Sequence, residues 1–226
     1  MKKKNHIRIL IVTGIVFALA LVVFLRSGAG RNKTFIFNKN LNLQIMTVDD
    51  TPFTLEDIAF YIAYEEMKVE TDAYVYNPEN TNQYWNVHTN GSFVRAAAKQ
   101  HVIDMAVHDY IFCSIADEKK IVLDVSEEKD LEYSKTDFYE DITDEQLQRL
   151  GVDKEKLDES MYNVAMAEKA QKVVSEEEDI LYDNLDAQAA TYEELYLSKH
   201  KVKLDKELWD KVDFGNVILE HKKWYE

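Results

Sequence analysis

The chain contains little of three residue types that crosslink or interrupt a polypeptide. Its 226 residues include one cysteine, two prolines and six glycines. A lone cysteine excludes an intramolecular disulfide, and so few helix breakers favour helices. Cys113 lies within a helical pattern of apolar residues, where a small buried hydrophobe is expected. The scarcity of proline and glycine predicts a mainly α-helical protein.

Acidic side chains are missing from one part of the chain. Residues 1–33 hold 7 of the 27 Lys and Arg residues and none of the 42 Asp and Glu residues. The remaining 193 residues therefore carry 20 basic against 42 acidic side chains. This surplus of negative charge disfavours binding to nucleic acid or to an anionic membrane surface, and it favours solubility.

The basic N-terminal part surrounds a run without charged side chains, residues 9–25. A helix of this length nearly crosses a hydrocarbon core of about 30 Å. Two interpretations remain, an uncleaved signal anchor or a long signal peptide. The run exceeds the length of about 7–15 residues that is usual for a cleaved segment, which favours the anchor.

The position of this segment defines the expected organisation of the chain. Basic residues are more numerous before the span than after it, which predicts a cytoplasmic N-terminus. We therefore expect a single-pass cell-membrane protein in which residues 1–8 are a cytoplasmic basic segment. Residues 9–25 are then the membrane span, residues 26–33 are a linker, and residues 34–226 form one extracytoplasmic domain.

Hydrophobic periodicity and capping residues predict a succession of helices with one or two short strands. The alternation of Leu41, Leu43 and Ile45 predicts a strand. Helices are expected to begin at Thr54 (ending near Thr71), at Ser92 (ending near Asp117), at Ser126, at Thr143 (stopped by Gly151), at Asp153, and after Ser175 as far as Leu195. A polar, aromatic loop over 72–90 and extended residues 121–125 lie between them, and Val202 and Leu204 alternate with lysines.

His101, Asp104 and His108 share one side of the second long helix, as metal ligands would. Their spacing matches no zinc pattern, however, and an exposed Asp104–His108 pair explains it as well. The chain also lacks a glycine-rich phosphate loop and a nucleophile motif. We therefore expect no metal, no cofactor and no catalytic residue.

The order of the segments resembles a known family. Leu43–Met46 forms an extended arm, Phe53–Asp57 opens a helix, and Tyr84-Trp85 precedes a long alanine-rich helix. Ile121–Glu128, Leu147–Asp153 and a Met/Ala-rich helix over 162–174 follow. Over about residues 40–210 this order is similar to the N-terminal chaperone domain of SurA/PrsA-type extracytoplasmic foldases, which shares its fold with the peptide-binding part of trigger factor.

The resemblance implies a helical cradle that holds unfolded exported polypeptides. Many members of the family also insert a parvulin-type prolyl isomerase domain rich in glycine. After Leu150 this chain has only Gly151 and Gly215, so we expect that domain to be absent. The fold implied is thus a transmembrane helix followed by one SurA-N-like helical domain with one or two short strands.

The expected function is a membrane-anchored chaperone-like module that binds unfolded or extended segments of exported proteins. Tyrosine and tryptophan are enriched where proteins hold partners, so Tyr76, Tyr84 and Trp85 are the candidate substrate-binding residues. The alternative for these aromatic residues, together with Tyr74, is that they cover the helical core. Two other functions remain open, a dedicated interaction subunit of an envelope complex and a peptidyl-prolyl isomerase with an unrecognised active site.

Overall fold

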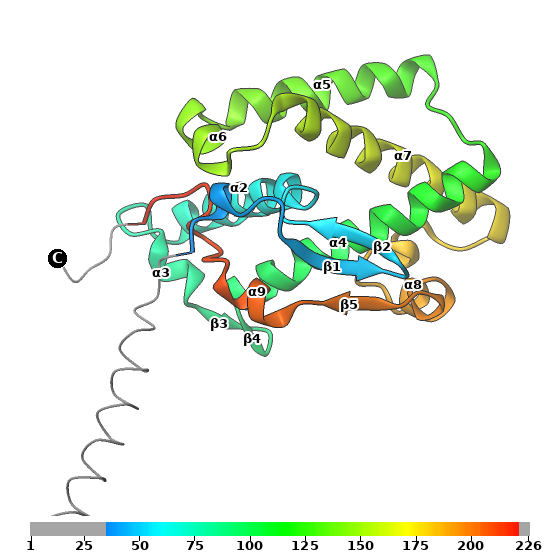
Figure 1. The fold of residues 1–226 in the computed structure, drawn as a ribbon. Helices are drawn as coiled ribbons and strands as arrows, with labels where there is room; N and C mark the ends of the chain where they lie inside the picture. Colours follow the sequence, from blue (N-terminus) through cyan, green and yellow to red (C-terminus); the bar gives the residue numbers. More distant parts are fainter. Residues whose placement is uncertain (1–34, 222–226) are drawn as a thin grey trace, which may run out of the picture. The chain divides into compact units, whose positions relative to one another are not determined.

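Four long helices form the frame of the protein in a computed structural model that describes residues 35–221 (Figure 1). The elements are η1 Phe37–Lys39, β1 Gln44–Val48, β2 Thr51–Thr54, α2 Ala59–Tyr76, α3 Asn82–Trp85, β3 His88–Thr89, β4 Ser92–Phe93, α4 Val94–Lys119, α5 Val125–Asp141, α6 Asp144–Leu150, α7 Lys154–Glu178, η2 Tyr182–Leu185, α8 Ala190–Leu195, η3 Leu197–Lys199, β5 Val202–Leu204 and α9 Lys206–Lys211. The prediction of a mainly α-helical fold is confirmed for this part of the chain.

The helices α4 and α7 are the longest and pack along each other, and α2 packs against α4. The apolar stripe of α4 includes Val102, Ala106 and Phe112, all buried. Val102 and Ala106, like Ala98, recur at a spacing of four residues on one side of the helix, and Phe112 widens this buried face. The core helix expected from Ser92 therefore exists, although it begins at Val94 because Ser92 and Phe93 pair as β4 with β3.

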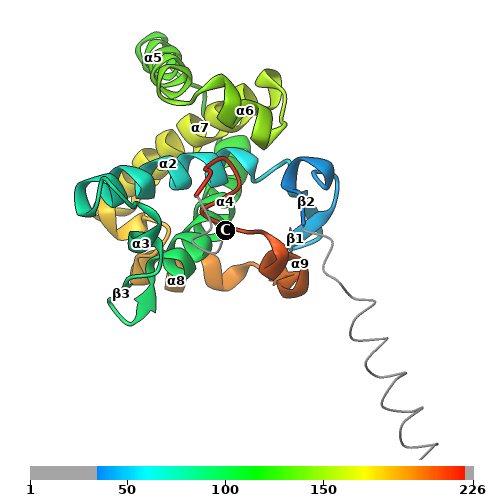
Figure 2. The same ribbon diagram turned by 90° about the vertical axis from the view of Figure 1, so that its left-hand side faces the viewer.

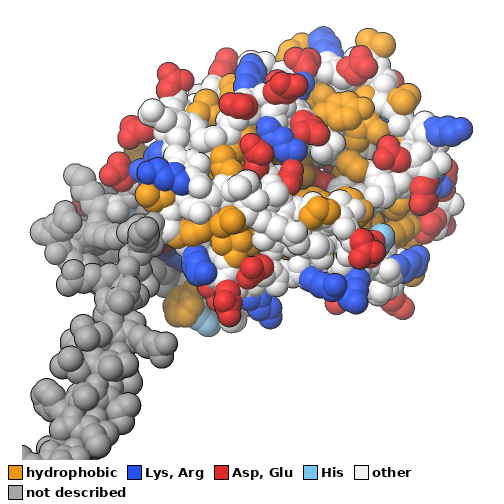
Figure 3. All heavy atoms as spheres, viewed as in Figure 1, with side chains coloured by type: hydrophobic (Ala, Val, Ile, Leu, Met, Phe, Trp, Pro, Cys, Tyr) orange, Lys and Arg blue, Asp and Glu red, His pale blue; other side chains and the backbone are white. Residues whose placement is uncertain are grey.

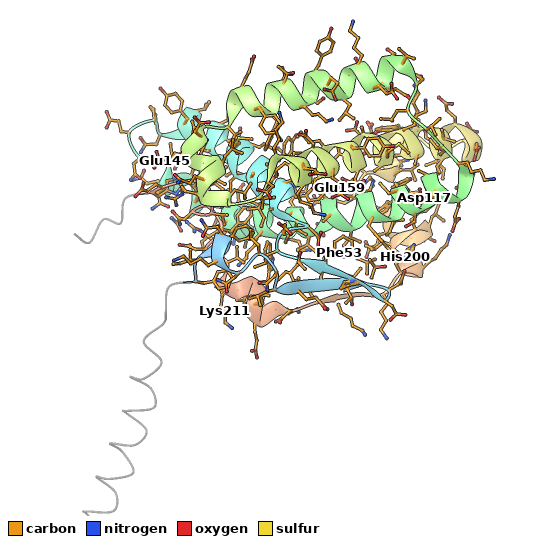
Figure 4. The ribbon with its side chains drawn as sticks, turned by 45° about the horizontal axis from the view of Figure 1, so that its top comes forward. Phe53, Asp117, Glu145, Glu159, His200 and Lys211 are labelled. Carbon is orange, nitrogen blue, oxygen red and sulfur yellow. The ribbon has the colours of Figure 1, made fainter. Side chains whose placement is uncertain are left out.

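A three-stranded antiparallel sheet lies beside the helices, with β1 between β2 and β5. Its central strand buries Ile45, Met46 and Val48. His200 lies near the end of the sheet (Figure 4). Its Nδ1 is 2.9 Å from Oδ2 of Asp49. The described residues contain five strands rather than one or two, because β1–β2 and β3–β4 form tight hairpins and β5 pairs with β1 from far away in the sequence.

The first long helix begins later than the sequence predicts. The backbone N–H and the hydroxyl of Thr54 both donate to Oδ2 of Asp57, at 2.7 Å each. These are the expected capping partners, but Thr54 ends strand β2 and the bonds close a turn rather than open the helix. Helix α2 starts at Ala59 and continues past Thr71 to Tyr76, two residues before Pro78, whose ring disfavours a preceding helical residue.

The loop predicted over residues 72–90 is largely structured. Its first five residues complete α2, residues 82–85 form α3, and residues 88–89 form β3. The aromatic side chains expected in a loop are therefore held by short elements. The reason is that Trp85 is buried in the core and fixes the segment around it.

Two caps were predicted well and one was not. The hydroxyl of Thr143 accepts from the N–H of Gln146, and Gly151 ends α6 with a left-handed backbone (φ 72°). Helix α5, by contrast, is capped by Asp124 rather than Ser126, with Glu127 as its reciprocal partner. The residue Val125, expected to be extended, is therefore the first residue of that helix.

The prediction of a separate acidic helix after Ser175 is wrong. Helix α7 begins after Asp153, as expected, and runs unbroken to Glu178, where Asp179 adopts a left-handed backbone (φ 54°). Two short elements, η2 and α8, occupy the rest of that stretch. Leu185 and Tyr192 are buried, so tertiary packing rather than helix periodicity positions these residues.

The basic segment 1–8, the expected membrane span 9–25 and the linker 26–33 lie outside the described residues. From Ile36 onward the described residues belong to one compact unit of the chain. Within that described part, no helix has the length and apolar character needed to cross a membrane.

Candidate functional site

A groove of about 1460 Å³ runs between α2 and α5, with α7 and α4 beneath it. Figure 2 shows α5 standing apart from α2, and α7 lying between them. Its lining combines aromatic and methionine side chains with carboxylates.

The α2 wall is aromatic and open to solvent. Tyr64, Tyr74 and Val75 line the groove with 46%, 64% and 81% of their surfaces exposed. The same helix buries Ile62, Val69 and other residues on its core side, so these three belong to its second face. Exposed aromatic and aliphatic side chains along one face of a groove are a feature of surfaces that meet a partner.

The α5 wall has a different character. The residues of α5 that line the groove recur at three- and four-residue spacing, which is one helical face. Its two large apolar side chains are Leu131 and Phe138, both buried. The remaining members of this face are Glu127, Asp130, Ser134, Asp137 and Asp141. Helix α5 therefore turns carboxylates toward the groove, rather than a purely apolar stripe.

A hydrogen-bonded network forms part of the floor. The hydroxyl of Tyr61 donates to Oδ2 of Asp109 at 3.0 Å, and Nδ1 of His108 lies 3.0 Å from the other carboxylate oxygen. The second ring nitrogen of His108 lies 3.0 Å from the carbonyl oxygen of Leu185. Burial raises the pKa of Asp109, although its bonds to His108 and Tyr61 oppose the shift. The network fixes α2, α4 and η2 together under the groove.

The C-terminal strap, residues 212–221, completes the core and reaches the groove. Its backbone has no helix or strand, and side chains of the helices satisfy its polar groups. Glu66 accepts from the N–H groups of Gly215, Val217 and Ile218, while Arg149 donates to the carbonyl oxygens of Asn216 and Leu219.

The strap also shapes one end of the site, because Leu219 lines the groove. Glu70, another lining residue, accepts from Nε1 of Trp85 at 3.0 Å and lies 3.1 Å from Nε2 of His221. The position of the groove end therefore depends on the docking of the strap.

The three residues selected from the sequence take different positions. The rings of Tyr76 and Tyr84 pack on each other with centroids 5.5 Å apart, beyond the C-terminal end of the α2 wall. Tyr76 is 58% exposed and Tyr84 is half-buried. Trp85 is completely buried against Phe214 of the strap. Trp85 is thus a core residue in this structure. For this residue the alternative applies, in which the aromatic side chains cover the helical core.

The histidine and aspartate residues weighed as metal ligands are not brought together. His101 pairs with Glu65 at 2.9 Å, Asp104 accepts from Gln100 and Gln188, and His108 belongs to the floor network. Across residues 35–221 there is no group of three His, Cys, Asp or Glu side chains arranged to hold a metal ion. Cys113 donates to the carbonyl oxygen of Asn163, and burial raises the pKa of its thiol to about 12, so it is a poor nucleophile.

Sequence reasoning missed the groove itself. The exposed face of α2 and the acidic face of α5 are both periodic in the sequence. Neither is distinguishable from an ordinary solvated face until the two helices are placed opposite each other.

Comparison with protein-family models, with curated proteins and with solved structures found no match for this chain.

Proposed function

We propose that the protein is a membrane-anchored, extracytoplasmic, chaperone-like module that binds unfolded or extended segments of exported proteins. The groove is the proposed binding site, and the SurA-N-like character of the domain is part of the same proposal. The single observation that carries it is the aromatic α2 wall, whose side chains line an open groove with much of their surface exposed. When an apolar segment of another chain covers these side chains, apolar surface is removed from water, which favours binding.

The composition of the lining supports a site for varied partners. Six aromatic side chains and three methionines line the groove, among them Met67, Met105 and Met161. Methionine adapts its shape because it is unbranched and polarizable, and tyrosine gives contact area at a low cost in entropy. The competing function is that of a dedicated subunit of an envelope complex. Such a subunit would bind one fixed partner, whereas the proposed module binds many.

The test measures suppression of aggregation. A chemically unfolded client is diluted into a stoichiometric amount of the full-length protein, and light scattering is followed. We expect suppression with several unrelated clients. The double variant Tyr64→Ala/Tyr74→Ala is expected to lose most of this effect. The matched control Tyr133→Ala/Tyr162→Ala removes two exposed tyrosines outside the groove and is expected to keep it.

The outcomes separate the candidate functions. Absence of suppression with every client, together with binding of one protein only, would replace the proposal by a dedicated interaction subunit. Equal loss in both double variants would move the site away from the groove. A proline-peptide assay on the same sample tests the isomerase alternative, for which we expect no acceleration.

A further inference from the structure

The carboxylates of the groove outnumber its cations. Eight Asp or Glu residues line it against three lysines. Two of those lysines are already paired, since Lys169 forms an ion pair with Glu127 and Lys68 lies 3.7 Å from Glu65. Acidic and basic side chains are intermingled on the face shown in Figure 3, and the acidic excess in the groove accompanies that of residues 34–226, which carry 20 basic against 42 acidic side chains.

The unpaired carboxylates lie mainly on one wall. Asp130, Asp137 and Asp141 on α5 have no Lys or Arg within 4.0 Å among residues 35–221, and neither has Glu168 on the floor. An amphipathic helix normally turns its charges to bulk solvent. Here the charged side chains flank Leu131 and Phe138 on the face that lines the groove.

The floor shows the same negative field. Desolvation raises the pKa of Glu168, and the nearby Asp109 raises it further. Burial also raises the pKa of Tyr182 to about 12, with Glu168, Asp186 and Asp109 contributing. Desolvation, the larger cause of both shifts, disfavours a charge of either sign, whereas the neighbouring carboxylates disfavour a further negative charge and favour a positive one.

The opposite wall supplies no comparable charge. The α2 side chains Tyr64, Met67, Thr71, Tyr74 and Val75 are uncharged. Lys68 is directed to Glu65, and the one carboxylate of this wall, Glu70, is bound to Trp85 and His221. A segment lying in the groove thus faces carboxylates on one side and aromatic side chains on the other. In an extended chain successive side chains point to opposite sides, so the two walls contact alternate residues.

From this arrangement, and resting on the proposed function, we propose that the groove selects extended segments in which Lys or Arg alternates with aromatic or aliphatic residues. The basic side chains meet α5 and the floor, and the apolar side chains meet α2. Within a partly enclosed groove such charge pairs are screened less than on an open surface.

The test uses four fluorescent nine-residue peptides and the full-length protein, with anisotropy as the measurement. One peptide alternates lysine with leucine and tyrosine. The second replaces each lysine by glutamine, and the third replaces each by glutamate. The fourth has the composition of the first, but its lysines form one block. We expect the alternating lysine peptide to bind about tenfold more tightly than the glutamine peptide, and the glutamate peptide to bind weakest.

Protein variants place the effect in the groove. Asp130→Asn/Asp137→Asn removes two lining carboxylates and is expected to weaken binding of the alternating lysine peptide about fivefold, leaving the glutamine peptide unchanged. The control Glu128→Gln/Glu140→Gln makes the same charge change at exposed positions of α5 outside the groove. It is expected to change the affinity less than twofold.

The outcomes distinguish this inference from the function on which it rests. If all four peptides bind equally, or if both double variants weaken binding by the same factor, the charge selection is wrong while the groove remains a peptide site. If the blocked peptide binds as well as the alternating one, the alternation is wrong. If no peptide binds at any charge, the proposed function itself fails.

Discussion

The carboxylate of Glu66, at the middle of α2, accepts a 2.9 Å hydrogen bond from the backbone N–H of Ile218, 152 residues further along the chain. The same side chain accepts from Gly215 and Val217, and it is completely buried. A single glutamate therefore holds a segment that has no regular structure of its own.

Replacing Glu66 tests how much the strap depends on this carboxylate. At pH 6 we expect Glu66→Ala to lower the free energy of unfolding by about 3 kcal/mol or more, because three buried N–H groups lose their acceptor. Urea denaturation of the purified protein measures the change. The exposed Glu79→Gln is the control and should stay within about 0.5 kcal/mol of the unaltered protein. A similarly small effect of Glu66→Ala would mean that the strap is held without it.

The pH dependence of stability follows from the same residue. Burial raises the pKa of Glu66 to about 7, above its ordinary value of 4.5, so the folded state binds more protons than the unfolded state between those values. The stabilising contribution is complete below pH 4.5 and is lost as the pH rises through 7. The free energy of unfolding of the unaltered protein, relative to that of Glu66→Gln, is therefore expected to fall from pH 5 to pH 8 by up to about 3 kcal/mol. A difference independent of pH would show that Glu66 does not titrate in this range.

Two glycines with similar backbones provide a matched pair for the packing of the strap. Gly215 (φ 88°) would place a Cβ 2.9 Å from Cε3 of Trp85, whereas Gly91 (φ 84°) has open space around it. Gly91→Ala should cost about 1 kcal/mol from its left-handed backbone alone. Gly215→Ala should cost about 2 kcal/mol more, because the ring of Trp85 must move. Equal costs in thermal or urea unfolding would mean that the strap yields freely at this point.

Replacing Trp85 tests whether this residue acts in the core or in client binding. We expect Trp85→Phe to lower the free energy of unfolding by about 1–3 kcal/mol, since it loses packing and the hydrogen bond to Glu70. Client affinity, measured with the fraction that remains folded, should be unchanged. A selective loss of affinity at unchanged stability would restore Trp85 to the contact surface.

Tyr76 and Tyr84 lie next to the groove rather than in its lining. Each ring covers part of the other, which leaves one face of the pair for a client. We expect Tyr76→Ala/Tyr84→Ala to weaken client binding about threefold, less than the loss of about tenfold expected for Tyr64→Ala/Tyr74→Ala. Titration of one labelled client with both variants decides the order. The reverse order would shift the site toward α3.

Local signals in the sequence predicted local structure. The Thr143/Gln146 capping box, the stop at Gly151 and the apolar stripe of α4 all depend on residues within a few positions of each other, and all three are confirmed. Distant partners were not predictable in this way. In the sequence, Glu66 lies between Glu65 and Met67 and resembles a surface glutamate. It is buried because the strap packs over it and binds its carboxylate. The continuation of α7 past Ser175 was missed because a serine followed by acidic residues resembles the start of a new helix, although Ser175 lies inside α7.

The site follows the same division. The chemistry expected of it, aromatic side chains within an acidic domain, was present in the composition. Its location was not, because the exposed aromatic face lies earlier on α2 than the chosen residues, at Tyr64 and Tyr74. What identifies this face is the position of α5 opposite it, and that position depends on contacts between helices rather than on any spacing along the chain.

The pairing of Met46 with Leu204 in the sheet, and of Glu66 with Ile218, has a consequence for biosynthesis. Contacts between α4 and α7 join residues such as Cys113 and Asn163, 50 positions apart, whereas β1 and Glu66 pair with residues about 150 positions later. A chain emerging from its N-terminus therefore cannot close its core in stages. It becomes native in one late step, because a chain truncated before residue 215 lacks the backbone N–H groups that bind the carboxylate of Glu66.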